Sequence, residues 1–348
     1  KNLDFTIIQQ KKTSIGIDSI TETRSEPENC PELEQAKKII LKLASKFDHW
    51  NNIFNNQSEQ KNFTLLKLIT HEINNAHKKL EKITTNLSEN NLIYLKNYFR
   101  KYLNPYWLQG EISNRVIKTP NGYHGDYLTM ELMYRNQFEG KTTLGSLLHK
   151  YVINDRSSQS VRLRRKYFAK KITTIIKNSK NSAILSIASG PATEIEDVLR
   201  KGLSPQKIVL LDQDSAALNY SINKLKNYLP STTELIVIES SIINLIRNKK
   251  NILQGIGPFD YIFSAGLYDY LSDILAKKLT RFLFENLNQK GCLEFGNFTN
   301  FQIGFFAGIS SDWKLTLRGK QEIKKFIPPD SKSDYFQIGD QVFSRVRK

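Results

Sequence analysis

The sequence of 348 residues predicts an α/β fold, in which a mostly helical region precedes a doubly wound sheet that ends in an antiparallel hairpin. Three observations support this prediction. The first third carries helical periodicity, short apolar runs alternate with helix-length segments in the second half, and a turn divides the last apolar stretch.

The helical region begins at Pro31 and extends to about Phe99. Apolar residues recur there at spacings of three and four, as at Leu33, Ala36 and Ile40, which is typical of helices packed on one face. Residues 1–30 are polar and weakly periodic, so we expect a poorly packed arm. The predicted division is an arm over 1–30, a helical substrate-cap region over 31–150 and a ligand-binding α/β domain over 151–348.

The sheet is predicted from short apolar runs that suit strands buried on both faces. These runs are Ala183–Ala188, Lys207–Leu211, Leu235–Ile238, Tyr261–Phe263 and Cys292–Phe295. Segments of helix length separate them, at roughly 193–202, 214–228, 242–252 and 271–287. The stretch Tyr335–Val346 is typical of two strands joined at Gly339-Asp340.

The charge and the cysteines narrow the classes of function. A net charge of +17 fits an acidic partner such as nucleic acid or a membrane surface. The lysines do not form one block, which favours a solvated surface instead. Cys30 and Cys292 are too few for a zinc site or a disulfide framework, so we expect a reducing cytoplasm. No run of about 18 apolar residues predicts a membrane span.

A sharp corner follows the first predicted strand, in the stretch Ala188-Ser189-Gly190-Pro191. Ligands of an open α/β sheet bind at the carboxyl ends of its strands. Gly190 permits a positive φ or a close backbone approach, and Pro191 is accepted at a helix start. The free N–H groups of the following helix favour a negative group.

The second predicted strand ends in Asp212, Gln213 and Asp214, and an acid there suits two ribose hydroxyls. A pyrophosphate requires several close glycines, whereas this corner has one. A nucleoside that carries an amino acid, S-adenosylmethionine, fits better, with its carboxylate at the helix start and its ammonium near Glu194. An NAD-binding variant is the alternative.

The fourth predicted strand ends in the small residues Ser264, Ala265 and Gly266, which leave room for a ligand. The following Tyr268 and Tyr270 either line this site or pack in the core. The predicted cofactor-binding set combines these strand ends with the serines after 235–238: Ala188, Ser189, Gly190, Pro191, Glu194, Asp212, Gln213, Asp214, Ser240, Ser241, Ser264, Ala265 and Gly266.

These motifs in this order resemble the Rossmann-like, seven-stranded class I S-adenosylmethionine-dependent methyltransferases, which makes 151–348 the cofactor-binding domain. The likeness covers about 120–348 and extends to a bacterial subgroup identified with biosynthesis of an extracellular factor, 3-hydroxypalmitic acid methyl ester. The motifs that carry the subgroup likeness are 122–127, 133–136, 138–140, 148–151, 161–165, 296–298 and Asp312-Trp313. The resemblance implies that the small tip at 264–266 faces the transferred methyl group.

The chain departs from the subgroup at two places. Ser189 stands where many relatives have cysteine, and 305–308 lacks a Met-Glu pair expected before Asp312. The first change is harmless for the cofactor. The second implies a different substrate if that acid contacts it.

The polar and aromatic block 122–135 is the candidate acceptor side. Our candidate catalytic residues are Tyr123, Asp126, Tyr127, Arg135 and Tyr268, because tyrosine hydroxyls orient an acceptor and arginine pairs with a carboxylate. The alternative is a structural cap, with Asp126 capping a helix over 127–134. The basic cluster of Arg162, Arg164, Arg165 and Lys166 is either an anion site or a solvated helix face, and we favour the solvated face.

The resulting hypothesis is methyl transfer to a small-molecule acceptor, with a carboxylic or hydroxy fatty acid as the implied class and S-adenosylhomocysteine as product. A carboxylate is already ionised and needs orientation alone, whereas an amine requires a base. Protein or RNA methylation, small-molecule N-methylation and a non-catalytic binding role remain alternatives. We expect no metal, and the N-terminal helices either roof the acceptor pocket or form a homodimer.

Overall fold

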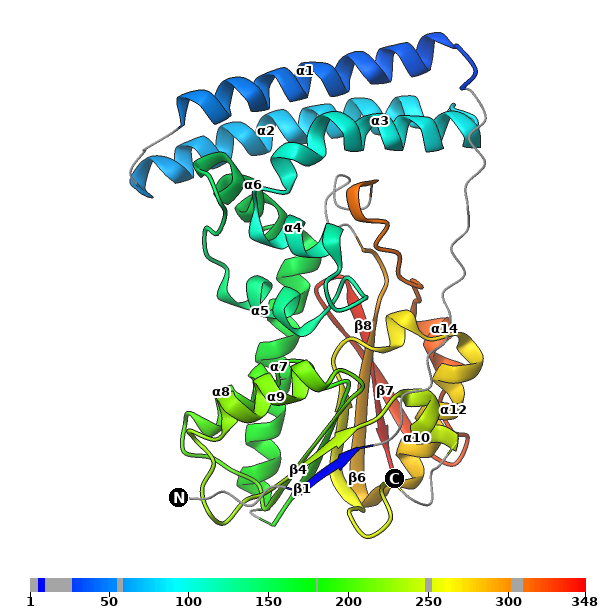
Figure 1. Cartoon of the computed structure of the whole chain (residues 1–348). Helices are drawn as coiled ribbons and strands as arrows, with labels where there is room; N and C mark the ends of the chain where they lie inside the picture. The colour runs from blue at the N-terminus through cyan, green and yellow to red at the C-terminus, as the bar shows by residue number, and fades with distance from the viewer. Residues whose placement is uncertain (1–5, 10–26, 55–58, 180, 248–251, 302–308) are drawn as a thin grey trace.

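The computed structural model describes residues 6–9, 27–54, 59–179, 181–247, 252–301 and 309–348. A layer of long helices lies over an α/β domain, with shorter helices between them (Figure 1). Most of the predicted arm lies outside the described residues, as does 305–308.

A single mixed sheet of eight strands forms the base, in the order β1-β4-β3-β2-β5-β6-β8-β7. Its strands are β1 (Thr6–Gln9), β2 (Ala183–Ile187), β3 (Lys207–Asp212), β4 (Glu234–Glu239), β5 (Phe259–Ser264), β6 (Leu287–Phe298), β7 (Lys332–Ile338) and β8 (Gln341–Arg347). Strands β1 to β6 pair in parallel, and β8 joins β6 and β7 antiparallel. The predicted strands and the closing hairpin are confirmed, while β1 is an eighth strand that the predicted arm contributes.

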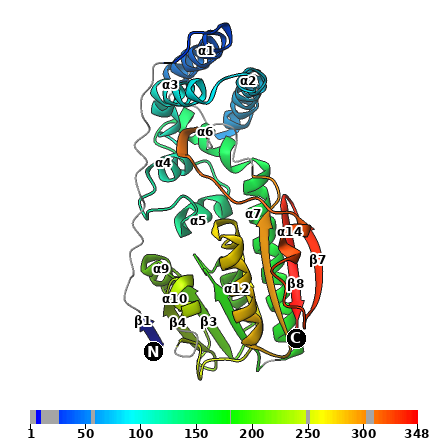
Figure 2. The same ribbon diagram turned by 90° about the vertical axis from the view of Figure 1, so that its right-hand side faces the viewer.

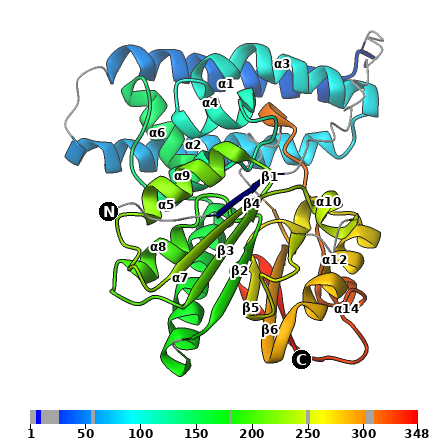
Figure 3. The same ribbon diagram turned by 60° about the horizontal axis from the view of Figure 1, so that its bottom comes forward.

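Helices cover both faces of the sheet and build the layer above it. They are α1 (Pro31–Ile53), α2 (Glu59–Thr84), α3 (Glu89–Trp107), α4 (Glu111–Lys118), α5 (Tyr127–Arg135), α6 (Thr143–Ile153), α7 (Arg156–Asn178), α8 (Thr193–Leu199), α9 (Ser215–Leu225), α10 (Ile242–Arg247), α12 (Asp273–Glu285) and α14 (Lys320–Lys324), with a 3₁₀ turn η1 (Tyr268–Tyr270). We call α1 to α6 the helical layer. Helices α7, α8 and α9 lie on one face of the sheet, and α10, α12 and α14 lie on the other (Figure 3).

The two faces of the sheet have separate apolar cores because strand side chains alternate. On β2, Ile184 packs in the core under α7 to α9, whereas Leu185 and Ile187 pack in the core under α10 to α14. A third core, which includes Phe47 and Trp107, holds the helical layer together. Figure 2 shows the helical layer standing above the carboxyl end of β6.

The helical layer also contacts the sheet directly. Phe298 at the end of β6 and Trp313 both pack into the core of the helical layer. Arg100 on α3 donates a hydrogen bond to the Ile309 carbonyl at 3.0 Å and pairs with Asp312. The carboxyl ends of the strands therefore face the helical layer, which places the ligand-binding edge of the sheet between the two parts.

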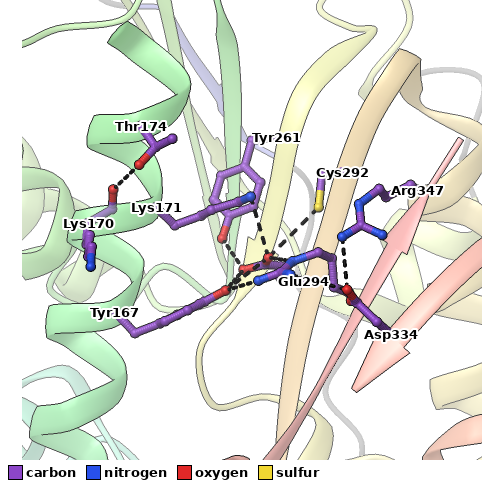
Figure 4. Close-up of polar contacts among 10 residues, drawn as sticks. Tyr167, Lys170, Lys171, Thr174, Tyr261, Cys292, Glu294, Asp334 and Arg347 are labelled. Atoms are coloured by element: carbon purple, nitrogen blue, oxygen red, sulfur yellow. Dashed lines mark hydrogen bonds and ion pairs between the residues drawn. The ribbon is translucent and has the colours of Figure 1, made fainter. Parts of the chain in front are cut away.

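A buried carboxylate on β6 fixes α7 to the sheet. Glu294 is fully buried and accepts hydrogen bonds from the hydroxyls of Tyr261 at 2.8 Å and Tyr167 at 3.0 Å. Arg345 donates from Nε to its Oε1 at 2.6 Å, and the Lys171 Nζ lies 3.9 Å from the same oxygen (Figure 4). We call Glu294, Tyr167, Tyr261, Lys171 and Arg345 the Glu294 cluster.

Both cysteines are free. Burial raises the pKa of the Cys292 thiol to about 12, so this group stays protonated and unreactive at neutral pH. Among the described helices, none has the length and apolar character required to cross a membrane.

Candidate active site

The corner after β2 has a strained backbone, and this strain marks the start of the site. Ala188, Gly190 and Ala192 have φ values of 51°, 50° and 47°, in the left-handed region. Glycine tolerates this region, whereas the two alanines adopt it at a cost that is commonly found at ligand sites. The corner is held by the Ser189 N–H, which donates to the Leu211 carbonyl at 3.1 Å.

Asp212 joins the corner to the end of β3. Its Oδ2 accepts the Gly190 N–H at 2.8 Å and its Oδ1 accepts the Asp214 N–H at 3.0 Å. Burial raises the pKa of Asp212 to about 6, although these backbone N–H groups oppose the increase. The Gln213 N–H also acts on this carboxylate, so three backbone N–H groups approach it.

Asp214 links β3 to the loop 119–126, which precedes α5. Its Oδ1 caps α9 by accepting the Ala216 N–H, while its Oδ2 accepts hydrogen bonds from Asn121 at 2.9 Å and Tyr123 at 3.3 Å. The loop turns sharply at Gly122, which has a φ of 82°. The first part of the candidate acceptor block 122–135 thus folds over the end of β3.

The Tyr123 hydroxyl keeps its proton in this position. Burial is the main cause that raises its pKa, and the nearby carboxylates of Asp212 and Asp214 raise it further. Tyr123 therefore remains a hydrogen-bond donor at neutral pH and is a poor general base.

The remaining cofactor candidates differ in their surroundings. Glu194 is buried at the start of α8, and burial raises its pKa. Gln213 is exposed at the tip of β3. The Ser240 N–H donates to the Asp212 carbonyl at 2.9 Å, which brings the end of β4 to the same edge. Ser241 instead accepts a backbone N–H at 3.2 Å and so begins α10.

The end of β5 carries the small-residue tip. Ser264 is fully buried, and its Oγ has no hydrogen-bond partner among the described residues; the same is true of the buried Ser189 Oγ. Ala265 and Gly266 follow and are partly exposed. Pro191 continues the corner toward α8. Because β2, β3, β4 and β5 pair in parallel, their ends meet at one edge of the sheet.

A small cavity lies beside the β5 tip, under the helical layer. It is lined by Gly125, Met130, Met133, Ser157, Val161, Arg164, Gly266, Asp269, Tyr270, Phe298, Phe301, Trp313 and Leu315. The Trp313 Nε1 donates to the Tyr270 hydroxyl at 3.0 Å, and a Cβ on Gly125 would lie 2.6 Å from that hydroxyl. Gly125 is therefore required for the close approach of the loop 119–126 to this wall.

The turn η1 after β5 determines which tyrosine enters this cavity. Arg318 is buried and donates to the carbonyls of Tyr268 at 2.8 Å and Leu271 at 2.5 Å, which holds the turn in place. Tyr268 points into the core, where it stacks on Phe295. Tyr270 lines the cavity in its place, so the prediction for Tyr268 is wrong about its position.

Two further catalytic candidates have structural surroundings. Asp126 is fully buried, caps α5 by accepting the Thr129 N–H at 2.8 Å and pairs with the Arg115 Nε at 2.7 Å. Its oxygens are thus occupied, as the alternative cap interpretation predicts. Arg135 is 43% exposed and pairs with Glu139, outside the cavity.

Tyr127 also lies outside the cavity lining. It packs against Tyr220 with ring centroids 5.1 Å apart, and Arg115 lies over its ring. Tyr123 is therefore the one proposed catalytic tyrosine that the described structure brings into contact with a strand-end acid.

The prediction of a solvated basic cluster is wrong for Arg164, which is 5% exposed and lines the cavity. A sequence signal for this position exists. Arg164 occupies the buried stripe of α7 between Val161, Phe168 and Ile172, at helical spacing.

Most residues of the cavity wall were not among the site candidates. Asp269 and Trp313 both line the cavity. Burial raises the pKa of Asp269 to about 6, while the Phe298 N–H and the charges of Arg164 and Arg318 oppose the increase. No local pattern marks Asp269, because its burial depends on β6 and on the segment around 318.

The sheet has the strand order β4-β3-β2-β5-β6-β8-β7, with β1 added beside β4, and this order reverses between β2 and β5. Such an order defines a Rossmann-like fold of the class I methyltransferase kind. The model of a family described as "Putative methyltransferase" matches residues 48–226, just over half of the chain. The chain belongs to this methyltransferase family. A comparison with curated proteins finds no match to the sequence.

Solved structures are similar to this chain in fold. A Bordetella parapertussis chain described as a possible exported protein matches with a TM-score of 0.51 and 14% identity, covering 92% of this chain and 99% of that one. A DUF574 family protein from Streptomyces avermitilis has a TM-score of 0.47 and 12% identity, over 63% of this chain and 97% of that one. The N-methyltransferase NodS from Bradyrhizobium japonicum, in complex with S-adenosyl-l-homocysteine, has a TM-score of 0.37 and 14% identity, over 53% and 86%. The first likeness supports the fold alone.

Proposed function

We propose that the chain transfers a methyl group from S-adenosylmethionine to a small-molecule acceptor. The observation that carries this proposal is the hydrogen bond from the Gly190 N–H to the Asp212 carboxylate, at 2.8 Å, where two parallel strands end. This hydrogen bond places an acid and a glycine that permits close approach at the same edge of the sheet, as a ribose with an amino-acid tail requires.

The hydrogen-bond donors and acceptors at these strand ends fit that cofactor. The Asp212 carboxylate is the proposed acceptor for the ribose hydroxyls. The buried Oγ atoms of Ser189 and Ser264 lack partners in the described part of the chain. The start of α8 offers N–H groups for the cofactor carboxylate. The predicted set of cofactor-binding residues remains our proposal, with Ser241 given a lesser part because it begins α10.

When bound, the cofactor supplies an electrophilic methyl group on a sulfonium. The chain has to exclude water and orient the acceptor, which is the larger part of catalysis in such displacements. We assign orientation to Tyr123 and to the cavity beside Gly266, which the helical region over 31–150 roofs. The sequence resemblance favours a carboxylic or hydroxy fatty acid as acceptor.

Calorimetric titration with S-adenosylhomocysteine tests the cofactor. Protein stripped of copurified ligand is expected to bind one molecule per chain, and Asp212→Ala is expected to bind far more weakly. Absence of binding by the unchanged protein, or equal binding by Asp212→Ala, would contradict the proposal. NADH serves as the matched ligand for the dinucleotide alternative.

Labelled cofactor then distinguishes the acceptor classes. Incubation with acids, amines, peptides and RNA is expected to label a small molecule. Label on RNA or peptide alone would show that the acceptor is a macromolecule, which the basic surface would bind. Light scattering of the same protein tests the alternative role of the N-terminal helices, the formation of a homodimer, which a monomer mass would overturn.

A further inference from the structure

The cavity beside the β5 tip contains a buried positive charge with few partners. Arg164 is 5% exposed, and its Nε is buried without a hydrogen-bond partner in the described structure. Its Nη2 lies 3.6 Å from the Met130 sulfur, a weak acceptor. Across the described residues, Arg164 has no ion pair with a carboxylate, so its charge is not neutralised by a direct contact.

The neighbouring acid does not fill this role. Asp269 also lines the cavity, but its Oδ1 accepts the Phe298 N–H at 2.6 Å, and within the described ranges no hydrogen bond joins it to Arg164. The other lining residues are mostly apolar or aromatic, including Met133 and Val161. The charges of Asp269 and Glu194 act on Arg164 without a direct contact, so they stabilise the guanidinium only in part. A ligand carboxylate would pair with it directly.

Two other arginines on the same helix, unlike Arg164, have their guanidinium groups paired within the protein. Arg162 donates from Nη1 to the carbonyls of Met133 at 3.1 Å and Ile153 at 2.7 Å. Arg165 forms a two-bond fork with Asp197, at 2.8 Å and 2.7 Å. Both have structural partners, so Arg164 is the arginine of this cluster that is available to a ligand.

The position of Arg164 relates it to methyl transfer. A Cβ added to Gly266 would lie 2.7 Å from Nη2 of Arg164, so the guanidinium packs against the backbone of the β5 tip. Under the proposed function, the cofactor sulfonium lies at this tip. An anion held by Arg164 would therefore lie next to the transferred methyl group.

We propose, on the basis of the proposed function, that Arg164 binds the carboxylate of the acceptor and that this carboxylate is the group methylated. The planar guanidinium fork matches a carboxylate. The cavity volume is about 30 Å³, so the assignment concerns the carboxylate end of the acceptor. The carboxylate oxygen gains the methyl group, the sulfonium becomes a thioether that keeps the bonding electron pair, and no proton is transferred. The uncharged ester no longer pairs with Arg164, which favours its release.

Binding measurements test this assignment without turnover. In the presence of S-adenosylhomocysteine, titrations use butanoate, octanoate and hexadecanoate, with the corresponding methyl esters and primary amines. The unchanged protein is expected to bind at least one acid and to bind its ester and amine much more weakly. Arg164→Met is expected to lose about 100-fold or more in affinity for the acid, and Arg164→Lys is expected to lose less.

Arg165→Met is the matched control, because it removes a paired arginine from the same helix outside the cavity. Its acid affinity is expected to stay within about threefold of the unchanged protein. With labelled cofactor, the acid product is expected to release its label as methanol in alkali, as a methyl ester does. Arg164→Met is expected to give no such product.

The outcomes separate this inference from the proposed function. Normal S-adenosylhomocysteine binding by Arg164→Met together with lost acid binding supports both. Undiminished acid binding by Arg164→Met, or alkali-stable label on amines alone, overturns the carboxylate assignment while the proposed function stands. Failure of the unchanged protein to bind S-adenosylhomocysteine overturns both. The melting temperature of Arg164→Met shows whether the variant folds, and it is expected to equal or exceed that of the unchanged protein.

Discussion

Two buried charges in this chain have opposite surroundings. Glu294 accepts hydrogen bonds from two tyrosines and an arginine inside the Glu294 cluster (Figure 4). Arg164, on the same helix as one of those tyrosines, has an unpartnered Nε and forms no ion pair within the described ranges. The first charge is saturated by the fold, whereas the second is left for a ligand, and the difference separates a structural site from a functional one.

The largest expected effect is on the stability that the Glu294 cluster provides. Glu294→Ala would leave Arg345 and Lys171 without their buried partner, and we expect a loss of about 3–5 kcal/mol in the free energy of unfolding. Urea denaturation measures this loss. Affinity for S-adenosylhomocysteine, measured on folded protein, should stay unchanged. A large fall in this affinity would show that the cluster also serves the cofactor site and would contradict the assignment of Glu294 as a purely structural charge.

The next largest effect is expected on cofactor affinity, from a substitution of Asp212, which connects the ends of β2 and β3. Asp212→Asn keeps the shape of the side chain but weakens hydrogen bonds to the ribose hydroxyls. Bonds to charged groups contribute roughly 1.5–3 kcal/mol each, so we expect about 100-fold weaker binding of S-adenosylhomocysteine by calorimetry.

The matched control for Asp212→Asn makes the same change at Asp260, near the start of β5. Asp260 accepts the Ala183 N–H at the start of β2, at 2.7 Å, and a hydrogen bond from Asn288 at 2.8 Å, so it lies at the edge of the sheet opposite Asp212. Folded Asp260→Asn should bind S-adenosylhomocysteine nearly as the unchanged protein does. Equal losses in the two variants would mean that the substitution acts through the fold and not through the cofactor.

A smaller effect is expected from crowding Arg164 without removing it. Gly266→Ala places a methyl group against Nη2 and should displace the flexible end of the guanidinium. We expect kcat/KM for the acid to fall about 30-fold, because misplacement by an ångström strongly reduces such reactions. The melting temperature should change little. An unchanged kcat/KM would mean that the observed position of Arg164 is irrelevant to turnover.

The smallest expected effect is the dependence of cofactor binding on pH. Burial raises the pKa of Asp212 to about 6, above its ordinary value, and the cofactor requires the ionised form. Binding of S-adenosylhomocysteine should therefore weaken as pH falls through this value, by roughly tenfold between about pH 7 and pH 5. Asp212→Asn should bind weakly without such a step, and a step that persists in this variant would assign the titration to another group.

The same raised pKa has the opposite effect on folding. The folded protein binds the proton of Asp212 more tightly than the unfolded chain does. The stability contributed by Asp212, and by Asp269 with its similarly raised pKa, is present at low pH and is lost as pH rises through about 6. Cofactor affinity and this part of the stability should therefore change in opposite directions with pH.

The sequence predicts the fold well because hydrophobic periodicity is local. Each strand run, the closing hairpin and the corner at Gly190 can be recognised without knowledge of their partners. The ligand edge follows from the order of strands and helices, which brings Asp212 and Gly190 together. The eighth strand β1 was not predictable from its short polar surroundings.

Side-chain direction was harder to predict, since it depends on packing between distant segments. The 3₁₀ turn buries Tyr268 and turns Tyr270 toward the cavity, and Arg318, much later in the chain, holds that turn. Asp126 is occupied by Arg115 on a different helix. The exception is Arg164, whose place on the apolar stripe of α7 is visible in the sequence and contradicts a solvated face.

The most direct test of this comparison is the free energy of unfolding of Arg164→Met, measured by urea denaturation beside the unchanged protein and without ligand. If Arg164 serves a ligand, removing its unpaired buried charge while keeping its apolar bulk should leave the protein equally stable or more stable. A loss comparable to that of Glu294→Ala would show that Arg164 is structural and would contradict the account.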